Sequence, residues 1–468
     1  MDKKYYKDIY FKYLVLLIII ATALRLYCIG VNSLWLDEVS TYGFSKDGFI
    51  AAFDYSLGGE YNPPLYYWFT YISLVICSLF SGLQQEVVLR LPAALFGILS
   101  VPAIYYLAHE MFDKRVAIIS ATFMTFSGFL IYYSQEARVY TLSMFLYIIL
   151  LYYYVKSYKT GSVKNWAIMG IVASLCIWSH FYMAIGLLCI AIHYIVMCAI
   201  DKKIDKNSLI PALVFLITSA PVFLILNNLF VERVSKDITW GFDGLTLLVN
   251  FVYLNLGMDL VTMLIFFVVG IVGLKCINDK CSKFNLLLII IPVFITFILS
   301  YYMSDVIDLN PRYLLFILPL IAICIAAFDL SLRDKKHGES LYVIFIVILI
   351  VVNIPFLTSY YTYPTKTDYN QISDYIVGVD TANIILMPQS EGKVFDYYLG
   401  SNHNYANNLT ELKNKANGDA LVMVTSGIIF GSNSGNVDVY TWLNDNAKLD
   451  KEIMNVKFYI FDNKDYIS

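Results

Sequence analysis

Long apolar runs separated by short polar loops fill the chain up to about residue 360. A membrane-spanning helix needs about 20 consecutive, mostly apolar residues. The runs therefore predict a polytopic α-helical membrane protein with about eleven spans. The predicted spans are Tyr13–Gly30, Leu91–His109, Val116–Tyr133, Tyr140–Val155, Trp166–Ser179, Met183–Ile200, Leu209–Leu226, Leu260–Leu274, Phe284–Tyr302, Tyr313–Phe328 and Leu341–Phe356.

One further apolar stretch, Leu65–Phe80, is ambiguous because it has only about 16 residues, which is short for a span. If it does not cross, every lysine-rich loop lies on the face of the basic N-terminus, as the positive-inside rule requires. If it crosses, all of these loops move to the other side. We therefore predict a cytoplasmic N-terminus, an extracytoplasmic C-terminus and a juxtamembrane helix at Leu65–Phe80 within an outer loop, residues 31–90.

The pattern changes near Thr365, where short apolar segments alternate between strand-like and helix-like spacing. Alternating elements with buried-type strands predict a small α/β domain. We place the transmembrane catalytic domain at residues 1–362 and the extracytoplasmic domain at 363–468. Its expected helices are Asp368–Val377, Val394–Leu399 and Val437–Leu443, and its expected strands are Asn383–Met387, Ala420–Val424 and Val456–Phe461.

Composition agrees with a membrane protein. Of 468 residues, 59% are hydrophobic and 15% are charged, whereas an average soluble chain is about 25% charged. The eight cysteines lie in or beside apolar runs, so no disulfide framework is implied. We expect the bilayer, and no nucleic acid, among the partners.

Two adjacent carboxylates, Asp37 and Glu38, follow Trp35-Leu36 just after the first span. Charge close to hydrocarbon is costly, so this acidic pair is a candidate functional site. Adjacent side chains do not face each other on a helix or strand, which excludes a proton-sharing pair. One carboxylate would act as a base while the other orients it or binds substrate. The alternative is that both stabilise the first turn of a juxtamembrane helix.

Single arginines occur at the outer ends of three predicted spans: Arg90, Arg138 and Arg312. A guanidinium group donates two hydrogen bonds to phosphate oxygens, so converging arginines suit a lipid-phosphate headgroup. One alternative is that each anchors its span at the interface. Another is that Arg138 pairs with Glu136 and Arg312 with Asp308. His180 lies at an outer boundary as well, where a structural interfacial histidine competes with a phosphate contact.

Five motifs in a fixed order resemble a known family. They are Trp-Leu-Asp-Glu (35–38), Asn-Pro-Pro-Leu-Tyr-Tyr-Trp (62–68), Arg-Leu-Pro (90–92), Tyr-Ser-Gln-Glu-Ala-Arg-Val-Tyr (133–140) and Pro-Arg-Tyr-Leu (311–314). Together they resemble the GT-C glycosyltransferases, most closely the glycosyltransferase family 39-like branch that holds protein O-mannosyltransferases and lipid A aminoarabinose transferases. The resemblance covers roughly residues 14–328.

The resemblance implies a GT-C fold, a polyprenyl-phosphate-linked sugar donor and an active site on the outer face. It makes Asp37 and Glu38 catalytic, and it makes Arg138, Arg312, Arg90 and His180 the residues that bind the donor phosphate. Tyr61, Asn62, Glu136 and Tyr140 would line the substrate cavity. This chain departs from its relatives at Asn62, because they commonly have His or Lys before Pro-Pro, so one cationic phosphate contact is missing.

The expected activity is an inverting hexosyl or pentosyl transfer to a hydroxyl of an acceptor protein, lipid or glycan, with Asp37 as the base. A lipid or sugar transporter, or a flippase, is the alternative, although transporters place their sites near the bilayer midplane on interrupted helices. A non-catalytic scaffold is a third reading. We assign no metal ligands, and the sequence leaves open a divalent ion on the acidic pair with Asp305 or Asp308.

Overall fold

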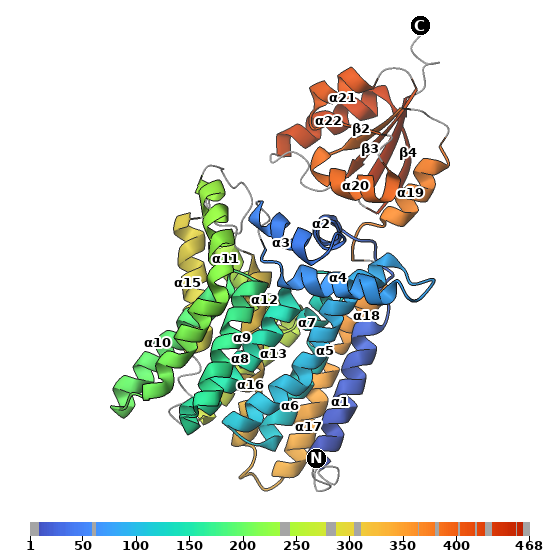
Figure 1. The fold of residues 1–468 in the computed structure, drawn as a ribbon. Coiled ribbons are helices and arrows are strands. Elements are labelled where there is room, and N and C mark those ends of the chain that lie inside the picture. Colours follow the sequence, from blue (N-terminus) through green and yellow to red (C-terminus); the bar gives the residue numbers. More distant parts are fainter. Residues whose placement is uncertain are drawn as a thin grey trace. The chain divides into compact units, whose positions relative to one another are not determined.

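The computed structural model describes residues 9–58, 62–234, 244–277, 287–303, 310–363, 365–379, 383–400, 403–416, 419–425, 433–454 and 456–461. The chain separates into two compact units (Figure 1). The first comprises Met1–Ile29, Phe44–Leu83 and Val87–Ser359, and the second comprises Gly30–Gly43, Gln84–Glu86 and Tyr360–Ser468.

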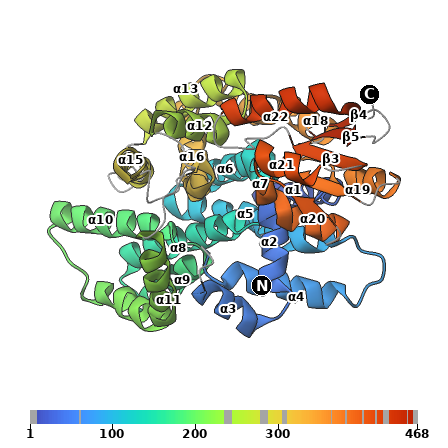
Figure 2. The ribbon, with the colours of Figure 1, turned by 90° about the horizontal axis from the view of Figure 1, so that it is seen from above.

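The described part of the first unit is helical. Its elements are α1 (Ile9–Leu26), α3 (Phe49–Leu57), α4 (Leu65–Cys77), α5 (Gln85–Met111), α6 (Lys114–Phe126), α7 (Gly128–Ser134), α8 (Tyr140–Thr160), α9 (Val163–Ser179), α10 (Met183–Asp201), η2 (Lys206–Leu209), α11 (Ile210–Val234), α12 (Gly244–Leu256), α13 (Leu260–Cys276), α15 (Leu287–Met303), η3 (Pro311–Ile317), α16 (Leu318–Ala326), η4 (Ala327–Ser331), α17 (Gly338–Val351) and α18 (Ile354–Thr362). Helix α9 packs between α8 and α11, and α13 packs against both α12 and α16 (Figure 2).

Six helices among the described residues are long and apolar enough to cross a membrane, or eight if each of two bent helix pairs counts as one span. The protein is therefore a multi-pass membrane protein, while the count of about eleven spans stays a prediction. Helix α4 has 13 residues, fewer than the roughly 20 that a span needs. Its length suits the juxtamembrane position that we predict for it.

The span predicted as one helix over Val116–Tyr133 is instead broken into α6 and α7, which meet at 56°. Ser127 ends α6, and its hydroxyl accepts a hydrogen bond from the Leu130 amide at the start of α7. The break leaves carbonyls at the end of α6 without helical donors. The buried guanidinium group of Arg25 in α1 donates to two of them, on Met124 (2.9 Å) and Thr125 (3.3 Å).

Helix α5 contains Pro92, which cannot donate to the carbonyl of Val88 one turn earlier. The hydroxyl of Ser73 in α4 donates to that carbonyl at 2.7 Å. The proline of the Arg-Leu-Pro motif thus creates an acceptor that fastens the short helix α4 to α5.

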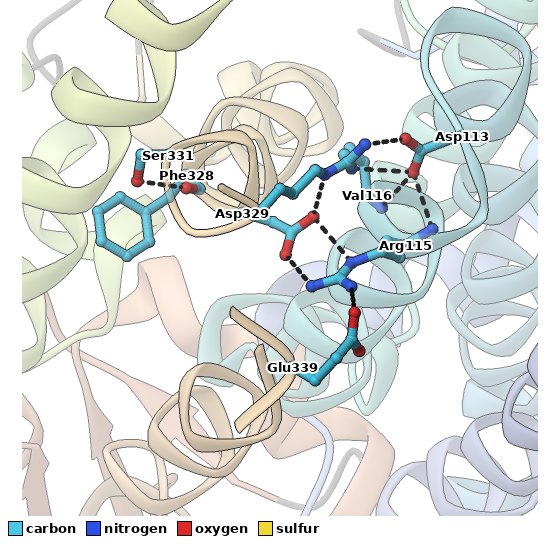
Figure 3. A network of polar contacts seen from close by, with 8 residues as sticks. Asp113, Arg115, Val116, Phe328, Asp329, Ser331 and Glu339 are labelled. Atoms are coloured by element: carbon cyan, nitrogen blue, oxygen red, sulfur yellow. Dashed lines mark hydrogen bonds and ion pairs between the residues drawn. The ribbon is translucent and has the colours of Figure 1, made fainter. Parts of the chain in front are cut away.

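An ionic network joins α6, η4 and α17 (Figure 3). The carboxylate of Asp329 is fully buried and accepts from Arg115 at 2.9 and 3.2 Å and from Arg333 at 2.8 Å. Arg333 also pairs with Asp113, the residue that caps α6, and Arg115 pairs with the exposed Glu339. Because a buried carboxylate needs compensating donors, Asp329 holds Arg115 at the start of α6 and Arg333 just after η4.

The second unit contains α2 (Leu36–Ser45, of which the unit includes the part up to Gly43) and a five-stranded sheet in the order β2-β1-β3-β5-β4. The strands are β1 (Ile384–Met387), β2 (Asn404–Tyr405), β3 (Ala420–Thr425), β4 (Lys448–Ile453) and β5 (Val456–Phe461). The pairs β1–β2 and β1–β3 are parallel, and β5 runs antiparallel to β3 and β4. The remaining elements are α19 (Tyr369–Val377), η5 (Gln389–Glu391), α20 (Gly392–Leu399), α21 (Leu409–Lys415) and α22 (Asn433–Asn446).

The three predicted strands correspond to β1, β3 and β5, and the three predicted helices to α19, α20 and α22. Prediction missed β2, α21 and β4. Strand β4 has the sequence Lys-Leu-Asp-Lys-Glu-Ile and is exposed along most of its length, because it lies at the edge of the sheet. It therefore lacks the apolar pattern by which β3 and β5 are recognised.

The ionic network makes a prediction about stability. Replacing Asp329 with Asn leaves Arg115 and Arg333 without their shared buried carboxylate, which should lower the free energy of unfolding by about 3 kcal/mol. The measurement is thermal unfolding of the purified protein in detergent. Glu339→Gln is the matched control, because Glu339 is 86% exposed and its loss should change the melting temperature little. Equal melting temperatures for the two variants would contradict this role of Asp329.

Candidate active site

The loop between α7 and α8 carries the Ser-Gln-Glu-Ala-Arg motif and is fastened to the end of α1. The side-chain amide of Gln135 donates to the carbonyls of Leu24, Arg25 and Tyr27, at 3.3, 3.1 and 2.7 Å. Leu24 and Arg25 belong to the last turn of α1 and Tyr27 follows it, and carbonyls at the end of a helix lack helical donors. The glutamine therefore fixes the loop that presents Glu136 and Arg138.

Two arginines from distant parts of the chain meet at one tyrosine ring. The guanidinium carbons of Arg138 and Arg312 lie 6.0 and 5.6 Å from the ring centroid of Tyr140, at the start of α8. Arg312 lies in the first turn of η3, where the side chain of Asn310 accepts from its amide at 3.2 Å. The ring faces attract both cations, and two guanidinium groups at one place form a binding geometry for an anion with several oxygens.

His180 adds a neutral group to these arginines. Its ring lies 6.2 Å from that of Tyr140 and 5.2 Å from that of Tyr313, and Tyr313 in turn stacks on Tyr182 at 4.7 Å. Burial, together with the charges of Arg138 and Arg312, lowers the pKa of His180 to about 3. Its Nδ1 accepts from the amide of Tyr182 at 3.2 Å. The neutral ring therefore carries its proton on Nε2, which is a hydrogen-bond donor.

A small pocket lies among these side chains. It is lined by Tyr140, Ser143, His180, Met183, Arg312, Tyr313, Leu315 and Phe316 and encloses about 10 Å³. That space holds roughly one water-sized group. The pocket thus matches an oxyanion position rather than a site for a whole sugar.

The structure does not bring every predicted residue into this cluster. Arg90 is not among the residues that line the pocket; it is buried, and its guanidinium group donates to the carbonyl of Ile29 at 2.8 Å. Glu136 is buried in the same loop as Arg138. Asn62 is half-buried, and its carbonyl accepts from the hydroxyl of Ser56 at 3.1 Å. Tyr61, Asp305 and Asp308 lie outside the described residues.

The acidic pair lies in the second unit, in the first turn of α2. The two carboxylates differ in environment. Glu38 is fully buried, and its Oε2 accepts from the ammonium group of Lys366 at 3.0 Å and from the amide of Trp35 at 3.4 Å. Asp37 is half-buried. Glu38 thus contacts the residue just before the helix, and Asp37 is the more accessible carboxylate.

No group of three His, Cys, Asp or Glu side chains within the described ranges is arranged to hold a metal ion. Two of the carboxylates considered for such a site, Asp305 and Asp308, belong to residues 304–309, which those ranges omit. The first unit thus offers cationic and neutral donors for an anion, and the second unit, described by itself, carries one accessible carboxylate.

Comparison with known proteins places this geometry in context. Residues 61–225 match the family described as dolichyl-phosphate-mannose-protein mannosyltransferase. The crystal structure of ArnT from Cupriavidus metallidurans in the apo state has a TM-score of 0.63 at 13% identity, over 96% of this chain and 98% of ArnT. The chain has the GT-C glycosyltransferase fold. The predicted resemblance is thereby confirmed at the level of family domain and fold.

Two further GT-C structures extend the comparison. ArnT bound to undecaprenyl phosphate has a TM-score of 0.60 at 12% identity, over 96% of this chain and 98% of that chain. The oligosaccharyltransferase AglB from Archaeoglobus fulgidus, in complex with an inhibitory peptide and a dolichol-phosphate, has a TM-score of 0.58 at 13% identity, over 100% of this chain and 75% of AglB. No curated protein sequence matches this chain.

Sequence analysis assigned no role to several residues at these sites. Tyr182 and Tyr313 were given none, although Tyr182 lies two residues after His180 and Tyr313 directly follows Arg312. The sequence does not indicate that Lys366 pairs with Glu38, because it is a single lysine 328 positions away. Only the folded chain brings it to the acidic pair.

The environment of His180 predicts that its ring stays neutral near physiological pH. With its pKa lowered to about 3, its ring resonances should not titrate between about pH 5 and pH 8. The measurement is NMR of histidine-labelled protein, with His180→Gln to assign the signal. Arg138→Met removes one of the positive charges and should raise this pKa. A midpoint near the ordinary histidine value of about 6.5 in the wild type would contradict the assignment.

Proposed function

We propose that this protein transfers a sugar from a polyprenyl-phosphate-linked donor to an acceptor hydroxyl on the extracytoplasmic side of the membrane, with inversion at the anomeric carbon. The observation that carries the proposal is the convergence of Arg138, Arg312 and neutral His180 around Tyr140. The GT-C fold and the family match support it, because the solved relatives include ArnT bound to undecaprenyl phosphate.

In the proposed reaction, Arg138 and Arg312 hold the donor phosphate. Each guanidinium group can donate two parallel hydrogen bonds to phosphate oxygens. As the bond between the anomeric carbon and the phosphate oxygen breaks, negative charge grows on that oxygen, and fixed cations stabilise it. The Nε2 proton of His180 supplies a further donor without adding a charge that titrates near neutral pH.

Asp37 is the proposed general base. The acceptor oxygen attacks the anomeric carbon from the face opposite the phosphate, its proton passes to Asp37, and the electron pair of the breaking bond leaves with polyprenyl phosphate. A single displacement of this kind inverts the anomeric centre. Because phosphate is a good leaving group, no general acid is needed. Glu38, which is buried against Lys366, is assigned no proton transfer.

The extracytoplasmic position of the site, the cytoplasmic N-terminus and the outward C-terminal α/β domain follow from the lysine distribution and belong to the proposal. The resemblance implies only that the acceptor carries a hydroxyl group. It does not distinguish a protein from a lipid or a glycan. The α/β domain is well placed in the chain to recognise the acceptor, since the acidic pair belongs to the same unit.

Replacing Asp37 with Asn should reduce transfer by about 10² to 10⁴-fold, the usual contribution of a general base. The measurement is release of polyprenyl phosphate from a panel of short-chain polyprenyl-phosphate sugars, with a membrane extract as the source of acceptor. Asp47→Asn is the matched control, because Asp47 is an exposed aspartate just after α2 and should keep full activity. Near-normal activity of Asp37→Asn would remove Asp37 from the mechanism. No release from any donor by the wild type would overturn the transferase proposal.

A further inference from the structure

The segment that carries the acidic pair is joined to the C-terminal part of the chain by specific hydrogen bonds. The amide of Leu34 donates to the hydroxyl of Tyr398 at 2.7 Å, and that hydroxyl donates to Glu86 at 3.0 Å. The amide of Asn370 donates to the hydroxyl of Ser33 at 3.3 Å. The residues just before α2 are thus held by side chains and backbone of α19 and α20.

One carboxylate oxygen of Glu38 accepts two of the bonds that fix the start of α2. Its Oε2 accepts from the amide of Trp35, which immediately precedes the helix, and from the ammonium group of Lys366. A glutamate that reaches back in this way stabilises the first turn of a helix. The ammonium group also lies 5.6 Å from the ring centroid of Trp35, so the lysine contacts both ends of this turn.

The burial of this ion pair makes the lysine necessary. Glu38 has no exposed side-chain surface, and the Lys366 side chain is 11% exposed. A buried carboxylate that loses its cation is strongly unfavourable, because its charge is neither solvated nor paired. Loss of Lys366 therefore favours protonation of Glu38 or its movement toward water, and that movement would displace the first turn that presents Asp37.

We propose that Lys366 is the positioning residue of the acidic pair: it neutralises buried Glu38 and so fixes the turn of α2 that presents Asp37 to the substrate. The functional part of this inference rests on the proposed role of Asp37 as the base. The structural part, that Lys366 and Glu38 hold α2, stands without it.

Several other charges act near this turn. Glu391 in η5 is one, since burial raises the pKa of its carboxyl group and the charge of Asp37 raises it further. Glu86 is another, and its carboxylate accepts a hydrogen bond from the hydroxyl of Tyr398. Asp37, Glu38, Glu391 and Glu86 thus bring several carboxylates to this segment, and Lys366 is the ammonium group that pairs with Glu38.

The first test compares Lys366→Met with the double variant Glu38→Gln/Lys366→Met, which removes both charges. In the single variant, ionised Glu38 lacks its partner, so kcat/KM should fall on the order of tenfold to a hundredfold at pH 8. Activity relative to wild type should recover as the pH is lowered and Glu38 takes up a proton. The double variant should regain most of the activity and keep a constant ratio to wild type across this range. Lys366→Arg keeps the charge and should also stay active.

The second test is hydrogen exchange of the amides in residues 35–43, which needs no substrate. Exchange should be faster in Lys366→Met than in wild type and should return toward wild type in the double variant. If Lys366→Met cannot be purified in folded form but the double variant can, the same conclusion follows, because only the unpaired carboxylate distinguishes them.

The outcomes distinguish the positioning role of Lys366 from the proposed role of Asp37 as the base. Unchanged exchange and a pH profile parallel to wild type in Lys366→Met would overturn the positioning role. Loss of activity that the double variant does not restore would also overturn it, since the lysine would then act on substrate itself. If exchange behaves as expected while Asp37→Asn remains active, the positioning of α2 holds and the proposed base is wrong.

Discussion

A buried charge in a largely apolar protein must have a compensating partner, and the described structure is organised by this constraint. Arg25 and Arg90 are buried and donate to backbone carbonyls near helix ends. Asp329 gathers two arginines, and Glu38 takes up Lys366. Apart from the pairing of Asp329 with Arg333, four residues apart, each of these pairings joins elements that are far apart in the sequence. Electrostatic compensation therefore fixes helix ends and loops where apolar packing alone would leave several arrangements open.

The arginines occupy two kinds of environment. Arg25, Arg90, Arg115 and Arg333 donate to carbonyls or carboxylates of the protein. Arg138 and Arg312 lie near the ring of Tyr140, which also adjoins the neutral ring of His180. Two cations at one ring are favourable when an anion joins them, and a phosphate dianion provides enough oxygens for both. In the proposed reaction the leaving phosphate is that anion.

Much of the fold could be predicted from the sequence because apolar length and alternation report directly on burial. The long apolar helices and the inner strands β1, β3 and β5 follow from these patterns, while the count of about eleven spans stays a prediction. The break at Ser127 could not be predicted, because it depends on a serine hydroxyl capping α7 and on Arg25 meeting the exposed carbonyls. Strand β4 was missed because an exposed edge strand can be polar. Arg138 and Arg312 could be selected as candidate site residues from the sequence, because each lies within one of the five motifs. The pairing of Glu38 with Lys366 could not be predicted, because it joins residues 328 positions apart.

The most direct test of the central claim is the dissociation constant of undecaprenyl phosphate for the purified protein in nanodiscs. Arg138→Lys and Arg312→Lys keep the charge but lose the two-pronged geometry, so each should weaken binding about tenfold, the cost of roughly one charge-assisted hydrogen bond. Arg115→Lys, in the ionic network of Figure 3, should leave binding unchanged. Unaltered affinity in both Arg138→Lys and Arg312→Lys would contradict the account, because the phosphate would then be held elsewhere.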